Sequence, residues 1–249
     1  MVFTEGKRVK KHKLIRIVIM LLLISSGCLM ILDEQSEGIM KRISDNGMRQ
    51  EAVNRKGNGI DFAGLQKING DIVAWIKVPG TKVDYPVVKA RDNSFYLSHG
   101  IDGSYSQYGA VFMDQRMYNR KLNETDNVII YGHNMGHWDD SMFGTLMNYK
   151  SSEFSFSNDR IYLYTQNGKS EYRIISVMRT TSADKWYEFI SLDKKSRYED
   201  KLRYLEVNSI HRFLNDKVNN PGKGQFITLS TCDYDGRYRM LIVGIKSNQ

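Results

Sequence analysis

The chain has 249 residues, of which 41% are hydrophobic and 26% are charged. A chain of this length forms one domain of ordinary size or two small ones, and its apolar content excludes a wholly disordered protein. It contains only two cysteines, too few for a disulfide framework or a four-cysteine zinc site. The formal charge of +8 suits either a nucleic acid or an anionic membrane surface as partner. Where the charged residues lie along the chain distinguishes these two partners.

The positive charge is concentrated at the N-terminus. Residues 1–16 hold six Lys or Arg against one Glu, which is +5 of the total +8. An apolar segment at 14–32 overlaps the end of this cluster, and its roughly 19 residues give a helix of about 28 Å, close to the hydrocarbon thickness of a bilayer. Under the positive-inside rule we expect a cytoplasmic tail at 1–13, a single transmembrane anchor at 14–32 and an extracellular remainder at the cell membrane.

Two other interpretations of the apolar segment remain open, namely a cleaved signal peptide and a lipoprotein signal ending at Cys28. All three place most of the chain outside the cytoplasm. The basic cluster is then a topology signal, and no nucleic-acid partner is expected. Cys232 becomes the only cysteine of the exported part, where a lone thiol is either a buried apolar residue or a reactive group.

Residues 33–57 are polar, with apolar positions at weakly helical spacing, and are interpreted as a stalk or N-terminal helix. The remainder, 58–249, is expected to form the folded domain, starting with a short helix at 58–70. Further helices are expected at 141–149 and at 193–216. Eight short β-like runs, separated by turn signals, cover 73–78, 83–88, 110–114, 127–132, 161–165, 172–178, 225–229 and 239–246. This pattern predicts a mainly β fold, an eight-stranded barrel with N-terminal helices and a long helix before the cysteine-bearing strand.

Three residues near strand ends form a candidate catalytic group. Cys232 ends one expected strand and Arg239 begins the next after a short turn, so an antiparallel hairpin brings them together. A nearby guanidinium lowers the pKa of a thiol and stabilises an oxyanion. Arg237 would share the strand face of Arg239 and is the alternative. His133 follows the strand at 127–132, and an imidazole with a pKa of about 6.5 exchanges protons readily at neutral pH.

No metal or other cofactor is expected. His133 and His137 are four residues apart, as in half of a helical metal site. The residues between them form helix poorly, and no Glu follows the first histidine as in the zinc protease motif. Asp233 and Asp235, next to the thiol, are interpreted as residues of a solvated turn.

These segments resemble a known family. Residues 228–232 read Thr-Leu-Ser-Thr-Cys and match the TLxTC motif of the sortases, the cysteine transpeptidases of Gram-positive bacteria. Residues 131–135 match the segment that bears the family's histidine, and Arg239 matches the family's arginine. The resemblance is closest to class B, extends over roughly 60–249, and includes the stretches 75–88 and 109–114.

The resemblance implies a sortase-type barrel and a membrane-anchored transpeptidase. Cys232 would attack the carbonyl of a Thr in a C-terminal sorting signal and form a thioacyl enzyme, which a cell-wall peptide amine would then resolve. His133 would protonate the leaving amine and deprotonate the incoming one, and Arg239 would hold the carbonyl and the oxyanion. The implied partners are surface proteins with a sorting signal and a cell-wall precursor or peptidoglycan peptide amine.

Substrate contacts are expected from the loop at 181–190, with Trp186 and Tyr187, and from Ser230 and Thr231 next to the thiol. Two alternatives remain open. One is a hydrolase on the same fold that uses water as acceptor. The other is a non-catalytic barrel that acts as a binding module and keeps its cysteine buried and inert.

Overall fold

The computed structural model describes residues 59–189, 198–211 and 224–247. The chain divides into two units, Met1–Glu51 and Ala52–Gln249, and all described residues belong to the second. The tail, anchor and stalk expected at 1–13, 14–32 and 33–57 lie outside the described residues, so these boundaries stay predictions.

The expected localisation needs a correction. Among the residues that the structure describes, no helix is both long and apolar enough to cross a membrane. The longest α-helix in these ranges, α4 (Tyr198–Asn208), has 11 residues, whereas a span needs about 20. The structure therefore does not support the single-pass membrane protein that the apolar segment suggested.

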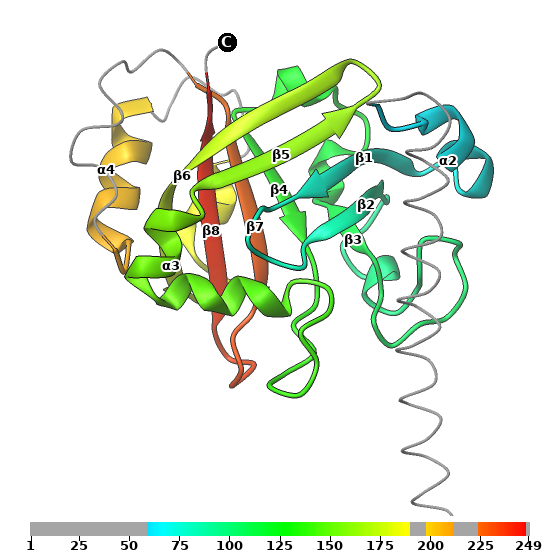
Figure 1. The fold of residues 1–249 in the computed structure, drawn as a ribbon. Coiled ribbons are helices and arrows are strands. Elements are labelled where there is room, and N and C mark those ends of the chain that lie inside the picture. The colour runs from blue at the N-terminus through cyan, green and yellow to red at the C-terminus, as the bar shows by residue number, and fades with distance from the viewer. Residues whose placement is uncertain (1–58, 190–197, 212–223, 248–249) are drawn as a thin grey trace, which may run out of the picture. The chain divides into compact units, whose positions relative to one another are not determined.

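Eight strands close into a barrel in the order β1-β2-β3-β4-β7-β8-β6-β5 (Figure 1). The pairs β2–β3 and β4–β7 are parallel, and the other six are antiparallel. The predicted mainly β, eight-stranded barrel is thus confirmed. The strands are β1 (Ile72–Lys77), β2 (Asp84–Lys89), β3 (Val111–Met113), β4 (Asn127–Tyr131), β5 (Arg160–Thr165), β6 (Gly168–Thr180), β7 (Phe226–Cys232) and β8 (Arg239–Lys246).

Short helices connect and cover the strands. The helix expected at 58–70 is α2 (Phe62–Ile68), capped by the Asp61 side chain. The helix expected at 141–149 is instead a 3-10 helix, η4 (Gly144–Lys150), followed by α3 (Ser152–Ser157). Of the helix expected at 193–216, residues 198–211 are described; α4 ends at Asn208, and 209–211 are not helical. The remaining 3-10 helices are η1 (Phe95–Leu97), η2 (Gln115–Met117), η3 (Leu122–Glu124) and η5 (Lys185–Glu188).

The alternation of side chains along β7 determines which residues can form a site. Ile227 and Leu229 point into the barrel and pack with the main core, whereas Phe226 packs on the outside in the cluster that contains Trp186 and Leu205. Successive side chains of a strand point to opposite faces. Ser230 and Cys232 are four and six residues after Phe226, so their side chains share its outer face, at the end of the strand.

Candidate active site

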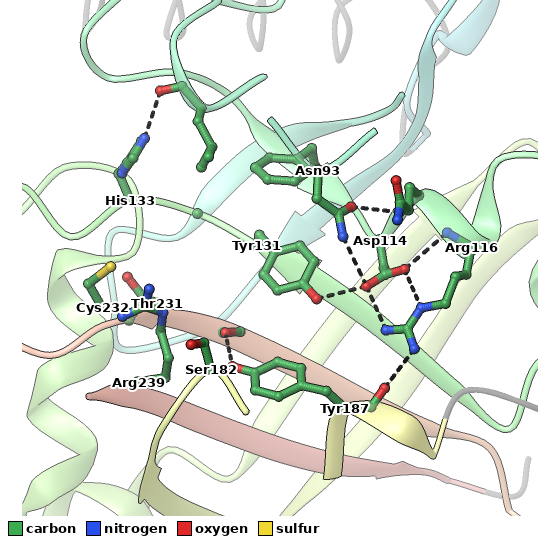
Figure 2. Close-up of a pocket in the computed structure, with 15 residues that line it drawn as sticks. Asn93, Asp114, Arg116, Tyr131, His133, Ser182, Tyr187, Thr231, Cys232 and Arg239 are labelled. Carbon is green, nitrogen blue, oxygen red and sulfur yellow. Dashed lines mark hydrogen bonds and ion pairs between the residues drawn. The ribbon is translucent and has the colours of Figure 1, made fainter. Parts of the chain in front are cut away.

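A cavity of about 610 Å³ lies where β4 and β7 end and β8 begins. It contains the three residues of the candidate catalytic group, His133, Cys232 and Arg239 (Figure 2). Three of the four expected substrate contacts line it as well, namely Tyr187, Ser230 and Thr231. The fourth, Trp186, does not, because it is fully buried in the core and donates its indole N–H to Thr228 Oγ1 at 2.9 Å.

The β7–β8 hairpin places Arg239 directly opposite Cys232. The two residues are register partners of an antiparallel pair, so their Cβ atoms are about 5 Å apart on one face. This is the proximity expected from the sequence. The thiol of Cys232 is free and partly exposed to the cavity. Arg237 lies in the turn before β8, with its side chain 80% exposed and next to Asp235, and it does not line the cavity.

The guanidinium of Arg239 keeps donors for a ligand. Its Nη1 donates to the carbonyl oxygens of Gly236 at 3.0 Å and Tyr238 at 3.2 Å. No described carboxylate forms an ion pair with it. Arg239 therefore brings an uncompensated positive charge to the cavity, next to the thiol.

Asp233, which follows the cysteine, is not the solvated residue that its sequence context suggested. It is 5% exposed and accepts from Lys150 Nζ at 2.6 Å and Arg179 Nε at 2.5 Å. Burial opposes its ionisation, but the hydrogen bonds from Lys150, Arg179 and the Tyr234 amide outweigh burial and lower its pKa to about 2. Two cations thus balance the negative charge beside Cys232.

His133 sits in the loop after β4, and its position is held by main-chain contacts. Its own carbonyl accepts from the Phe143 amide at 2.8 Å, and its Nε2 lies 2.8 Å from the Leu97 carbonyl oxygen, toward which the ring points in Figure 2. The neighbouring Asn134 donates its side-chain amide to the Cys232 carbonyl at 3.0 Å. This bond ties the histidine loop to the end of β7, although the two are 98 residues apart.

The glycine before the histidine is required by packing. A Cβ at Gly132 would lie 2.7 Å from Cγ of Phe143, whose ring is fully buried. The loop can therefore pass over this ring only without a side chain at position 132, and this close approach fixes the start of the histidine loop.

A polar cluster on the cavity floor was missed by the sequence analysis. Asp114, 1% exposed, accepts two hydrogen bonds from the Arg116 guanidinium, at 2.7 and 2.8 Å, and one from Tyr131 Oη at 2.7 Å. Burial disfavours the Asp114 carboxylate, yet its bonds to Arg116 and Tyr131 dominate and lower its pKa. Arg116 also donates to the Tyr187 carbonyl at 2.8 Å, so the cluster connects the end of β3 to η5.

The signal for this cluster was present in the sequence, since an acid and an arginine two residues apart directly follow a hydrophobic strand. Other cavity-lining residues carried no such signal and were also missed. They are Asn93, Leu97, Phe112 and Gln115. Ser182, which also lines the cavity, lies within the loop at 181–190 from which substrate contacts were expected.

Tyr187 and Ser230 form a second polar pair in the wall. Their hydroxyl oxygens are 2.7 Å apart, and burial raises the pKa of Tyr187 to about 12. The phenol therefore stays protonated and is available as a donor at neutral pH. Thr231 is 2% exposed, and its Oγ1 has no hydrogen-bond partner among the described residues.

The described residues also bear on whether this part of the chain could hold a metal ion. Within the described ranges, no group of three or more His, Cys, Asp or Glu side chains is arranged to hold a metal ion. His137, four residues after His133, instead stacks on the Tyr234 ring at 3.6 Å between centroids.

A free thiol opposite an arginine, in a cavity that also contains a histidine, is the arrangement of a cysteine acyltransferase. The protein-family model of the sortase domain matches residues 76–246 of this chain. The chain belongs to the sortase family. It is 34% identical to Sortase B of Listeria monocytogenes over 183 residues, which is 72% of this chain and 71% of the relative. It is also 34% identical to Sortase B of Staphylococcus aureus over 172 residues, 69% of this chain and 67% of the relative.

Solved structures of class B sortases have the same fold. Sortase B of Clostridium perfringens superimposes with a TM-score of 0.65 and 33% identity, covering 75% of this chain and 99% of that one. A Staphylococcus aureus sortase B–substrate complex superimposes with a TM-score of 0.74 and 27% identity, covering 86% and 99%. The chain is thus a class B sortase transpeptidase, an enzyme family that acts on proteins bearing sorting signals.

Proposed function

We propose that this sortase cleaves its sorting signal after a Thr residue, through a thioacyl intermediate on Cys232, and transfers the released protein to a cell-wall peptide amine. The observation that carries the proposal is the pairing of Cys232 with Arg239 across the β7–β8 hairpin, in a cavity that His133 also lines. A nucleophile, an oxyanion partner and a proton carrier are the three groups that acyl transfer requires.

In the first half-reaction, the Cys232 thiolate attacks the Thr carbonyl carbon, and the carbonyl oxygen becomes an oxyanion beside Arg239. The intermediate then collapses to a thioester. The C–N bond breaks, and the departing amine takes a proton from His133.

The second half-reaction runs in reverse with a different amine. The incoming amine gives its proton to His133 and attacks the thioester, and the Cys232 thiolate leaves. Splitting the transfer into two steps lets one cavity serve both the donor peptide and the acceptor.

The polar wall formed by Tyr187 and Ser230 suits an extended peptide, whose backbone needs hydrogen-bond partners when it leaves water. The protonated Tyr187 phenol is such a partner, whereas the buried Oγ1 of Thr231 lies on the inward face of β7 with Ile227 and Leu229. Trp186 does not line the cavity, but its hydrogen bond to Thr228 attaches η5, which bears Tyr187, to β7. The donors on this proposal are surface proteins with a sorting signal, and the acceptor is an amine of a cell-wall precursor or of peptidoglycan.

Mass spectrometry of the purified protein with a panel of sorting peptides tests the proposal. We expect an acyl adduct on Cys232 whose mass ends at the Thr residue, and a ligated product when a glycine or diamino-acid peptide amine is added. Cys232→Ala should form no adduct. An adduct that ends at another residue would contradict cleavage after Thr, and release of free acid alone in the presence of the amine would favour the hydrolase.

The proposed roles of Arg239 and His133 can be tested by substitution, and Arg237, in the same β7–β8 hairpin, is a matched control for Arg239. Arg239→Ala and His133→Ala should each lower kcat/KM by about 10²-fold or more. Arg237→Ala removes the same charge two residues away, where the side chain is in water, and should retain most of the activity. Equal losses in Arg237→Ala and Arg239→Ala would overturn the role of Arg239.

A further inference from the structure

A second cavity, of about 760 Å³, lies at the opposite end of the barrel from Cys232. It is lined by Gln225, which precedes β7, and by Lys246, the last residue of β8. Cys232 and Arg239 occupy the other ends of these strands, about 23 Å away at 3.3 Å per residue. In Figure 1, β8 accordingly runs from the β7–β8 turn to the far end of the barrel. The two cavities share no lining residue.

The charged side chains that line this cavity are all positive. Five cationic side chains line it, and none of its lining residues is Asp or Glu. The five come from β2, β6, β8 and the loop before η3 and are Lys89, Arg120, Lys121, Lys169 and Lys246. None of them forms an ion pair with a described carboxylate.

The neighbouring acids have partners of their own. Asp126 pairs with Lys201 at 2.8 Å, and Glu171 pairs with Arg160. Glu124 accepts from the main-chain amide of Lys121 at 3.1 Å, so its carboxylate offsets part of the charge around Lys121. The other four cations of the cavity are not paired with any of these carboxylates.

Two of the lysines occupy positions that normally face a barrel's apolar interior. Lys89 follows Val87 by two residues on β2 and is in register with Met113, and both of these partners belong to the main core. Lys246 is in register with Tyr172, also a core residue. Because alternate residues of a strand share a face, both lysines belong to the inward faces of their strands, at the mouth of the barrel.

Lys89 is also partly withdrawn from water. Its Nζ donates to the Arg120 carbonyl at 3.2 Å, and burial lowers its pKa. A half-buried ammonium held by a neutral carbonyl, with further cations around it, is costly unless an anion joins it. Phosphate suits this role, because it offers a high charge density and several acceptor oxygens to lysine donors.

We propose that this end of the barrel binds an anion with two or more phosphate groups, in a site centred on Lys89 and Lys246. The cavity volume lies within the range of small-molecule sites. The site is distinct from the proposed transpeptidation centre, so its occupancy does not depend on the assignment of Cys232. The phosphates belong either to a free small molecule or to a phosphodiester chain of which the cavity holds a segment.

Isothermal titration calorimetry of the full chain with inorganic pyrophosphate and with a glycerol-phosphate tetramer tests the proposal. We expect saturable binding that weakens steeply with salt and falls about tenfold or more in Lys89→Gln/Lys246→Gln. A charge-matched control, Lys82→Gln/Arg203→Gln, removes two exposed cations outside the cavity and should change affinity less than twofold.

Each result has a defined meaning. Tighter binding of pyrophosphate assigns the site to a free ligand, and tighter binding of the tetramer assigns it to a phosphodiester chain. No saturable binding of either probe, or equal losses in the two double variants, overturns the proposal.

Folding and activity complete the test. Lys89→Gln/Lys246→Gln should keep the wild-type circular dichroism spectrum and full turnover of a sorting peptide, since it lies at the other end of the barrel. If the double variant does not fold, Lys246→Gln alone, at an exposed position, should still weaken binding several-fold, and unchanged affinity in this variant would overturn the proposal.

Discussion

Around Cys232, the described side chains pair their charges in such a way that Arg239 faces the cavity without a described carboxylate partner. Asp233 accepts from Lys150 and Arg179, while the hydrogen bonds of the Arg239 guanidinium to described residues go to main-chain carbonyls. The arginine next to the thiol is thereby available for an oxyanion instead of being consumed by the adjacent acid.

The Asp233 network should stabilise the fold in a pH-dependent way. Its folded pKa, about 2 against an ordinary 3.8, means that the stabilisation is complete at neutral pH, declines as pH falls below about 4, and is lost near pH 2. Because Lys150 and Arg179 are partly solvated, Asp233→Asn should cost about 1–2 kcal/mol at pH 7.

Urea unfolding at pH 7 and pH 3 measures this effect. The difference in the free energy of unfolding between wild type and Asp233→Asn should be about half as large at pH 3 as at pH 7. Asp140→Asn, in a pair with the exposed Lys82, is the control and should cost less than about 0.5 kcal/mol. A difference that stays constant between the two pH values would contradict the lowered pKa.

The Tyr187 hydroxyl should affect substrate binding more than the chemical step. It bonds Ser230 in the cavity wall but is not one of the proposed reacting groups. Tyr187→Phe should lose about 1 kcal/mol of stability and raise KM several-fold, with a smaller change in kcat.

Tyr149→Phe is the matched control for steady-state kinetics. Its hydroxyl donates to the Asn158 carbonyl at 2.6 Å, outside both cavities. The stability cost should be similar, with KM unchanged. If both variants shift KM equally, the effect of Tyr187 is structural and not a substrate contact.

Among the elements, the site depends on how the histidine loop is fastened to its neighbours. The loop is held at the His133 carbonyl by Phe143, at Asn134 by the Cys232 carbonyl, and at Gly132 by the close approach of the Phe143 ring. These contacts hold together the ends of β4 and β7, whose candidate catalytic residues His133 and Cys232 are far apart in sequence.

Gly132→Ala should disrupt this fastening. The added Cβ would overlap the Phe143 ring, which is buried and has little room to move. We expect about 1–3 kcal/mol of destabilisation, and at least tenfold lower kcat/KM because His133 is displaced.

Thermal unfolding and steady-state assays measure both effects. Gly70→Ala, where no atom lies within 4 Å of the new Cβ, is the control. Gly132→Ala/Phe143→Leu should recover part of both losses because the smaller side chain makes room. An absence of any recovery would show that ring overlap is not the cause.

At the scale of the whole molecule, the strand that bears Cys232 is more deeply buried than the helix that precedes the barrel. β7 is paired on both sides, with β4 and β8, and its residues from Phe226 to Thr231 are buried. By contrast, α2 has seven residues and buries only Phe62 and Leu65.

Hydrogen exchange followed by mass spectrometry should reproduce this gradient. Peptides from β7 and β8 should exchange at least about 10²-fold more slowly than peptides from α2. The same peptides in denaturant provide the intrinsic rates. Comparable protection of α2 and β7 would contradict a rigid barrel with less stable peripheral helices.

Local patterns in the sequence were sufficient where neighbouring residues decide the structure. Alternating apolar positions and turn signals predicted all eight strands, and the hairpin geometry that joins Cys232 to Arg239 follows from one short turn. The motif around Cys232 and the segment at 131–135 were enough to indicate the family.

Other features depended on contacts between distant segments. β6 begins at Gly168, well before its apolar run, because it pairs with β5 over its first residues and with β8 over the rest. Trp186 and Tyr187 are adjacent, yet the first is in the core and the second in the cavity wall, because η5 turns them toward different neighbours.

The sequence by itself therefore determined the fold class, which follows from periodicity and turns. It also indicated the family and the candidate reactive residues, through the resemblance of the segments around Cys232 and His133 to known motifs. Only the tertiary structure decided which carboxylate is neutralised, which of two arginines faces the thiol, and where uncompensated cations gather. Those outcomes depend on burial and on partners far away in the chain, and no local pattern contains that information.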